Sequence, residues 1–333
     1  MKILVTGASG YIGSKLAHAL AVKGNTVHAL VRSAPSDSLL KHPNIKIFTG
    51  DILNKESLAV AIKNCKQVYH TAGVVRLWAK DPDIFYQHNV SGTQNVLEAA
   101  WKEGVSKFVY TSSCGVWGSC NDHMLIETDP RTSAFDNDYD LSKFLAEKSV
   151  KEYGSRGLFT VIVNPPRVYG PGPLRHSSGV NRFILRLLRK KIALLPWRLE
   201  TKANYAFIDD VVKGHLLAMD RGLGGERYIL GGENISYRRL VETVNTIGQT
   251  KNLIVRMPPV LFKTIGHIEL VRGKLNGHDP LITPNVAKRL QSDKMFDCSK
   301  AIRQLGYHIT PFEEGLTTTI NHLKNNLYEN EQP

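Results

Sequence analysis

The sequence lacks the features that mark exported, disulfide-bonded and membrane-spanning proteins. Its 333 residues include four cysteines, none of them in a Cys-x-x-Cys pair, so neither a disulfide framework nor a metal site is indicated. No apolar run approaches the roughly 18 residues that cross a bilayer. The first apolar run ends at Val5, too early for a secretion signal, and we therefore expect a cytoplasmic protein.

Acidic residues are also in short supply. The chain has 43 Lys and Arg against 30 Asp and Glu, and residues 175–202 hold eight basic residues and a single acid, Glu200. Such a segment attracts anionic cofactors, and its amphipathic stretch at 181–191 is compatible with peripheral contact with a membrane surface. A helix that faces the protein core would show the same pattern. No nucleic-acid-binding motif accompanies the charge, so no nucleic-acid partner is expected.

A glycine motif directly follows the first predicted strand. Ile3–Val5 form an unbroken apolar run, typical of a strand buried on both faces of a parallel sheet. The glycines that follow are spaced G-x-x-G-x-x-G and lead into an amphipathic helix. They permit a tight turn, the approach of backbone N–H groups to a pyrophosphate, and close contact between helix and strand. A helix N-terminus attracts phosphates. The stretch therefore predicts a dinucleotide site, to which we assign Gly7, Ser9, Gly10, Tyr11, Ile12 and Gly13.

Apolar runs alternate with helical patterns along the first half of the chain. The runs are residues 26–31, 45–48, 67–71, 107–111 and 158–163. This alternation predicts parallel βαβ units. We expect an α/β fold with a Rossmann-type doubly wound parallel sheet and a smaller C-terminal α/β substrate domain. The NAD(P)-binding domain is placed at residues 1–165, and the substrate-binding domain at 166–330, interleaved with the first.

The end of the second strand indicates which dinucleotide is bound. An acid there accepts the ribose 2′-hydroxyl of NAD, whereas an Arg favours the 2′-phosphate of NADP. The strand ends in Val31-Arg32-Ser33, with no acid before Asp37. A guanidinium can bind a phosphate through two hydrogen bonds. We therefore expect a preference for NADP(H) through Arg32, with NAD(H) as the alternative.

Two further strand ends carry candidate cofactor contacts, because open α/β sheets bind ligands at the carboxyl ends of their strands. Asp51 follows the third strand, where it can accept a hydrogen bond from the adenine amino group or cap the helix that begins near Asn54. Ala72 and Gly73 follow the fourth strand and leave room for a cofactor ribose.

A tyrosine and a lysine four residues apart are the candidate reactive pair. Tyr139 and Lys143 lie on one face of a predicted helix. A nearby ammonium lowers the pKa of a tyrosine, which makes it a usable proton donor or acceptor near neutral pH. Serines at 112 and 113 end the neighbouring strand, where a hydroxyl can hold a substrate oxygen against the tyrosine. The spacing alone is common in helices, and the serines and the glycine motif strengthen it.

Taken in order, these motifs resemble those of the extended short-chain dehydrogenases/reductases, the NAD-dependent epimerase/dehydratase superfamily. The segments that carry the resemblance are 6–13 (TGASGYIG), 50–52 (GDI), 89–95 (NVSGTQN), 112–118 (SSCGVWG), Tyr139 with Lys143, 168–172 (VYGPG) and 207–211 (FIDDV). Residues 74–95 and 295–307 are most similar to the dihydroflavonol-4-reductase-like group, which borders hydroxysteroid dehydrogenases and a set of sugar epimerases.

The resemblance implies roles for the matching residues. Tyr139 is expected to be the catalytic acid/base, Lys143 to tune its pKa and bind the cofactor ribose, and Ser113 to align the substrate oxygen. The cofactor contacts that it implies are Asp51 and Ile52 at the adenine, Ala72 near the ribose, and Pro166 and Val168 near the nicotinamide. Relatives are monomers or homodimers, and both states are open for this chain.

Two departures from the family pattern bear on the substrate. Members that bind nucleotide sugars usually have an Arg where this chain has Ala203 and a His where it has Phe207. We therefore expect an NADP(H)-dependent oxidoreductase that interconverts a ketone and a secondary alcohol on a small apolar or polycyclic molecule. One alternative is an NAD-dependent sugar epimerase or dehydratase with a tightly bound, recycled cofactor. Another is a non-catalytic cofactor-binding module, against which the intact Tyr139 and Lys143 count.

Overall fold

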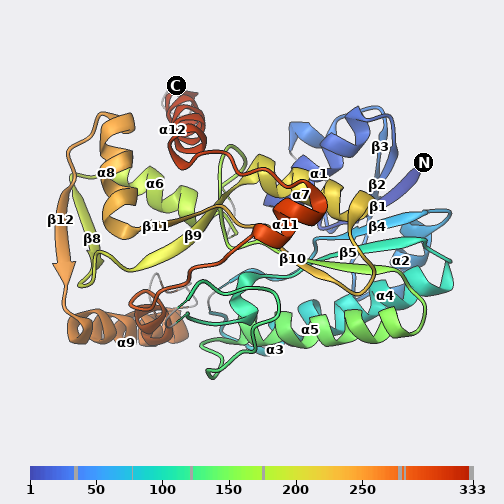
Figure 1. Ribbon diagram of the computed structural model, residues 1–333, viewed down its shortest axis with the longest axis horizontal. Helices are drawn as coiled ribbons and strands as arrows, with labels where there is room; N and C mark the ends of the chain where they lie inside the picture. The colour runs from blue at the N-terminus through green and yellow to red at the C-terminus, as the bar shows by residue number, and fades with distance from the viewer. Residues whose placement is uncertain are drawn as a thin grey trace.

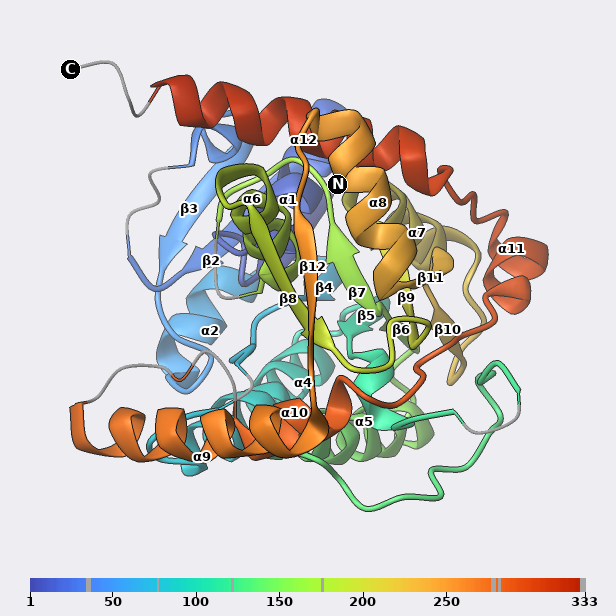
Figure 2. The same ribbon diagram turned by 90° about the vertical axis from the view of Figure 1, so that its left-hand side faces the viewer.

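The computed structural model describes residues 1–33, 37–76, 78–120, 123–174, 177–276, 280 and 283–329. A large parallel sheet with helices on both faces lies beside a smaller part that is built from later residues (Figure 1). Figure 2 shows that smaller part from the front. Arg175, which begins the basic segment, lies outside the described residues.

The central sheet has seven strands, all parallel, in the order β10-β6-β5-β4-β1-β2-β3. The strand order reverses between β1 and β4, and doubly wound sheets bind ligands at the carboxyl ends next to such a reversal. The strands are β1 (Lys2–Thr6), β2 (Thr26–Val31), β3 (Ile45–Thr49), β4 (Gln67–His70), β5 (Lys107–Thr111), β6 (Thr160–Asn164) and β10 (Arg227–Ile229). The predicted doubly wound parallel sheet is confirmed.

Helices cover both faces of this sheet. One face carries α1 (Tyr11–Val22) and α7 (Ile208–Arg221); the other carries α2 (Lys55–Ile62), α4 (Gly92–Lys102) and α5 (Asp138–Ser155) (Figure 1). Val5 packs into the first core and its neighbour Leu4 into the second, and both are fully buried. This two-sided burial explains the unbroken apolar run of β1.

The helical segment between β4 and β5 is not uniform. It begins as α3 (Asp83–Phe85), passes through a π-helical turn (Tyr86–Ser91) and continues as α4. Wide turns of this kind often occur at functional sites. Here the turn buries Asn89 against the loop that follows β4.

The smaller part contains a three-stranded sheet, β11-β9-β7, and a two-stranded parallel pair, β12-β8. Its strands are β7 (Arg167–Tyr169), β8 (Ile192–Pro196), β9 (Lys202–Phe207), β11 (Glu233–Ser236) and β12 (Leu253–Met257). The remaining helices of the described residues are α6 (Gly179–Arg189), α8 (Tyr237–Gly248), α9 (Pro259–Asn276), α10 (Pro284–Arg289), α11 (Ser299–Leu305) and α12 (Phe312–Glu329), and short 3₁₀ turns occur at Ser38–Leu40 and Cys114–Val116.

Segments beyond residue 166 return to the large sheet. β10 pairs with β6, and α7 packs against α1, so the two parts interleave in the chain. The division at 165/166 itself stays a prediction. The basic helix α6 buries Ile184 and Leu187 and exposes Arg186 and Arg189, so its apolar side faces the core. Among the helices of the described residues, none has both the length and the apolar character needed to span a bilayer.

Candidate active site

The glycine motif is closely packed, and the Gly10 nitrogen donates to the Gly7 oxygen at 2.8 Å. Gly7 has φ +67°, and a Cβ there would lie 2.6 Å from the Ala72 nitrogen; a Cβ at Gly13 would lie 2.2 Å from the Gly7 oxygen. Helix α1 begins after Gly10 with no side-chain cap and no acid in its first turn. Its positive end therefore carries no competing anion, and the motif fits the diphosphate of a dinucleotide.

The side chain of Tyr11, which the sequence analysis assigned to the cofactor site, is buried and bonded within the protein. Its side chain is 2% exposed, donates to the Gly170 oxygen at 2.7 Å and accepts from Asn181 Nδ2 at 3.1 Å. The ring thus joins α1 to the smaller part, and only the backbone of Tyr11 is left for a phosphate. The neighbouring Ser9 and Ile12 are partly buried, and their cofactor role stays a prediction.

The expected adenosine contacts lie at the ends of β2 and β3. Arg32 is exposed directly after β2 and has no hydrogen-bond or ion-pair partner among the described residues. Asp51 Oδ1 accepts from the Leu53 nitrogen at 2.9 Å, whereas Asn54 caps α2 by accepting from the Ser57 nitrogen at 2.7 Å. Asn54, and not Asp51, therefore caps α2. Asp51 stays a candidate ligand of the adenine. The Ile52 side chain, also assigned to the adenine, is buried against Gly92.

The three proposed catalytic residues come from the end of β5 and the first turns of α5. Asn137 caps α5 by accepting from the Asp140 nitrogen at 2.7 Å, which places Tyr139 in the first turn. Ser113 Oγ accepts from the Gly115 nitrogen at 3.1 Å, and the Ser113 side chain is close enough to Tyr139 to act on its pKa, which it lowers. The structure thus brings together a serine and a tyrosine that are 26 positions apart in the sequence.

Lys143 lies in the same helix, one turn after Tyr139. Its Nζ donates to the Thr111 oxygen at 2.6 Å and lies 4.4 Å from the centre of the Tyr110 ring. Burial lowers the pKa of Lys143 to about 7 and raises the pKa of Tyr139 to about 12. The tyrosine pKa therefore moves opposite to the expected direction, because loss of solvent around the phenol outweighs any nearby positive charge.

Asn89 is a site residue that the sequence reasoning missed. Its Oδ1 accepts from the Val74 nitrogen at 2.7 Å, and its Nδ2 donates to Ser142 Oγ at 2.9 Å. It thereby ties the loop after β4 to helix α5, and a Cβ on Gly73 would lie 2.8 Å from it. The sequence signal was its place at the start of segment 89–95, which carries the family resemblance but was given no role for this side chain.

A small pocket opens beside Ser113. Its volume is about 50 Å³, and its lining includes Pro166, Ala203 and three cations that the sequence reasoning did not assign, Arg167, Arg289 and Lys294. Ala203 therefore lies at the same pocket as Ser113. Val168, the other expected nicotinamide neighbour, is a partly buried residue of β7 that packs against the core.

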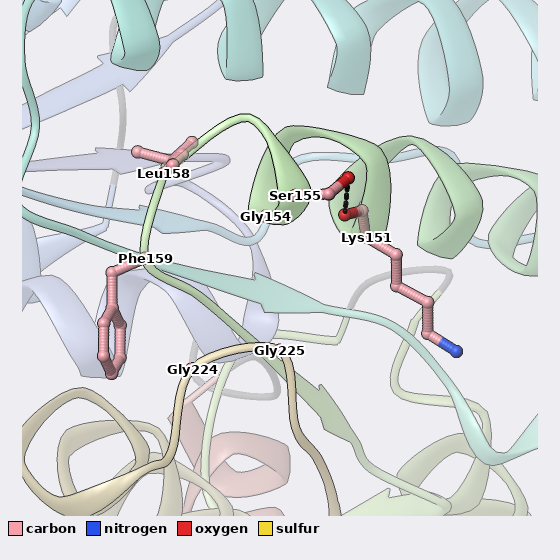
Figure 3. Close-up of a pocket in the computed structure, with 8 residues that line it drawn as sticks. Lys151, Gly154, Ser155, Leu158, Phe159, Gly224 and Gly225 are labelled. Carbon is pink, nitrogen blue, oxygen red and sulfur yellow. Dashed lines mark hydrogen bonds between the residues drawn. The ribbon is translucent and has the colours of Figure 1, made fainter.

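A larger hollow, of about 370 Å³, lies between the end of α5, the start of β6 and the loop at Gly224-Gly225 (Figure 3). Its lining includes Lys151, Ser155 and Phe159, of which only Lys151 carries charge. It lies at the amino end of β6, opposite to the end where doubly wound sheets bind ligands. The smaller pocket at Ser113 is therefore the candidate active site.

Comparisons with known proteins agree with this geometry. Residues 3–231 match the model of the NAD dependent epimerase/dehydratase family. A Synechocystis protein with the provisional name dihydroflavonol 4-reductase is 32% identical over 97% of this chain and 95% of its own. A 3 beta-hydroxysteroid dehydrogenase/Delta 5→4-isomerase of Mycobacterium tuberculosis is 29% identical over 92% of this chain and 85% of its own. The crystal structure of gox2253 has a TM-score of 0.81 and 32% identity, covering 97% of this chain and 98% of that one.

The fold and the site together define an NAD(P)-dependent oxidoreductase. The chain belongs to the NAD dependent epimerase/dehydratase family, the extended short-chain dehydrogenases/reductases.

Proposed function

We propose that this protein interconverts a ketone and a secondary alcohol with NADP(H). The observation that carries the proposal is the proximity of Tyr139 to Ser113, which lines a pocket, together with the buried Lys143 in the same helix as Tyr139. The names of two relatives, a dihydroflavonol reductase and a hydroxysteroid dehydrogenase, support a substrate whose carbonyl or hydroxyl is set in an apolar ring system.

The proposed roles follow from the protonation states. A phenol with a pKa of about 12 is protonated at neutral pH, so Tyr139 can donate its proton to a carbonyl oxygen. Ser113, on the neighbouring strand end, holds the same oxygen. Bound NADP(H) supplies or accepts the hydride. Lys143 anchors α5 to the end of β5 and offers an ammonium to the cofactor ribose.

The cofactor preference rests on Arg32. Its exposed guanidinium follows β2 and has no carboxylate partner in the part of the chain that the structure describes, which leaves it available to a 2′-phosphate. In this proposal residues 1–165 bind the cofactor and residues 166–330 complete the substrate pocket.

The test is NADPH oxidation with a panel of ketones, followed by Tyr139→Phe. Removal of the hydroxyl is expected to lower kcat/KM by roughly 100-fold or more, because proton transfer by a positioned side chain contributes about that much. Tyr153→Phe in the same helix is the control and should keep full activity, since Tyr153 lies far from Ser113 along α5. Full activity of Tyr139→Phe would contradict the mechanism. Purified protein that carries stoichiometric, non-exchanging NAD and shows no net redox turnover would instead favour the epimerase alternative.

A further inference from the structure

Lys294 is a buried lysine whose ammonium makes no hydrogen bond to the described residues. The residue is 5% exposed, and its Nζ has no hydrogen-bond partner among the described residues. Asp136 Oδ2 lies 3.8 Å from this ammonium, too far for a hydrogen bond. A buried ammonium without a hydrogen bond costs free energy, and burial together with the neighbouring Arg289 lowers the pKa of Lys294 to about 7.

The backbone around Lys294 is held on both sides. Its nitrogen donates to the Lys202 oxygen at 2.9 Å, and its oxygen accepts from the Asn204 nitrogen at 3.0 Å. These bonds pair residue 294 with β9 opposite Ala203, whose side chain lines the same pocket. The lysine is therefore positioned by the sheet and not by a flexible loop.

Arg167 is a second cation of the pocket with no carboxylate partner among the described residues. Its Nη1 donates to the Tyr205 hydroxyl at 3.1 Å and its Nη2 to the Tyr237 hydroxyl at 3.2 Å. Two neutral hydroxyls hold the guanidinium in place without neutralising it. A guanidinium has five N–H donors, so further donors are available to a ligand.

The carboxylates nearby do not balance this charge. Arg289 is bound to Asp140 Oδ2 at 2.5 Å, which pairs that cation fully. Asp136 lies 3.8 Å from Lys294 and equally far from Lys288, so it is shared between two lysines. In the lining of the pocket, Arg167 thus has no carboxylate partner among the described residues, and Lys294 shares a distant one with Lys288.

We propose that the substrate carries a small anionic group, a carboxylate or a phosphate, close to the reacting carbonyl, and that Lys294 and Arg167 bind it beside Ser113. This inference rests on the proposed function and narrows its substrate class to oxo acids or oxo phosphates and the matching hydroxy compounds. The pocket of about 50 Å³ exceeds the roughly 10–15 Å³ that one water needs, and it suits one small polar group better than a ring system. An apolar ring system would then extend from the pocket and would not enter it.

The first experiment compares matched substrates. NADPH oxidation is measured with 2-oxo and 3-oxo acids against their methyl esters, and with dihydroxyacetone phosphate against dihydroxyacetone. We expect the anion of one pair to be preferred by roughly 30-fold or more in kcat/KM, because a desolvated charge pair is worth at least about that factor. The pair that shows the preference distinguishes carboxylate from phosphate. Equal efficiency within both pairs would overturn the proposal.

The second experiment changes Lys294. Lys294→Met is expected to raise the KM of the anionic substrate by roughly 30-fold with little change for the ester, whereas Lys294→Arg should restore most of the loss. Lys288→Met is the matched control, because Lys288 is the same distance from Asp136 but its side chain is 79% exposed. An equal loss for acid and ester in Lys294→Met would indicate a structural role and contradict the proposal.

Binding separates this proposal from the proposed function. The dissociation constants of the oxo acid and its ester are measured by calorimetry in the presence of NADP, without turnover. Tight binding of the acid that depends on Lys294, with no redox activity, would retain the anion subsite and refute the oxidoreductase proposal. Redox activity on neutral ketones with no dependence on Lys294 would support the oxidoreductase proposal and refute the anion subsite.

Discussion

The ammonium of Lys143 donates a 2.6 Å hydrogen bond to the backbone oxygen of Thr111, the last residue of β5. This bond fixes the first turns of α5 against the end of the sheet. Ser113 lies two residues beyond Thr111, and Tyr139 lies one helical turn before Lys143, so the same contact sets the distance between serine and tyrosine. The buried Lys143 thus supplies a charge and also fixes the position of α5 relative to β5.

Replacing Lys143 by Met removes the anchor and the charge but keeps the length of the side chain. We expect kcat/KM for ketone reduction to fall by roughly 100-fold, and the NADPH dissociation constant to rise, because an ammonium is lost from the cofactor site. Lys151→Met, an exposed position in the same helix, should leave both quantities unchanged. Wild-type kinetics in Lys143→Met would show that the lysine has no role in the reaction.

The cofactor preference is tested by Arg32→Ser. We expect the dissociation constant of NADPH to rise by roughly 10-fold to 100-fold, since one charge-assisted contact with the 2′-phosphate is lost, while that of NADH stays the same. Fluorescence titration of the reduced cofactors measures both values. The control is Lys23→Ser, an exposed cation at the other end of α1. Tighter binding of NADH than NADPH by the wild-type protein would already refute the assignment.

Gly13→Ala tests whether the glycine motif requires close contact of helix and strand. A Cβ at Gly13 would lie 2.2 Å from the backbone oxygen of Gly7, which cannot move without shifting the loop. We expect a loss of about 1–3 kcal/mol in the free energy of unfolding, together with weaker cofactor binding. Urea unfolding and cofactor titration measure the two effects. Gly179→Ala, with nothing within 4 Å of its added Cβ, is the control and should be neutral or slightly stabilising.

The parts of the fold that the sequence predicts correctly are those governed by local patterns. The strand expected at 26–31 and the one at 107–111 match β2 and β5 residue for residue, because each is a buried apolar run between turns. The π-helical turn around Asn89 was not predictable, since a single wide turn leaves the helical periodicity of a short segment unchanged.

In the candidate site, too, some residues follow from local sequence patterns and others come together only through tertiary contacts. Ser113, Tyr139 and Lys143 follow a spacing and a strand end that the sequence displays. Arg167 and Lys294 belong to β7 and to a segment paired with β9, and they meet only because the chain returns to the pocket after residue 166. Their charge gave no signal among 43 basic residues, since partners brought together by tertiary contacts cannot be read from composition.

The buried ammonium of Lys294 makes stability depend on pH. Burial lowers its folded-state pKa to about 7, whereas an unfolded chain has the ordinary lysine value of about 10.4. Between these values the unfolded state binds more protons, so the free energy of unfolding rises with pH, by up to roughly 1.4 kcal/mol per unit from this lysine alone. Below pH 7 its destabilising effect is fully present.

Lys294→Met removes this dependence. The variant is expected to be more stable than the wild-type protein at pH 7, with the difference shrinking toward pH 9, while its affinity for an anionic substrate is lower near pH 7, where the wild-type lysine is still charged, and this difference also shrinks toward pH 9. Urea unfolding at pH 7, 8 and 9 measures the stability, with Lys288→Met as the exposed control that should follow the wild-type curve. Lys143, whose pKa is also lowered to about 7, is present in all three proteins and cancels in the comparison. A variant that is less stable than the wild-type protein at pH 7 would show that Lys294 supports the fold. A variant that is more stable but binds the anion more weakly would show that the protein retains a destabilising buried charge in order to bind its substrate.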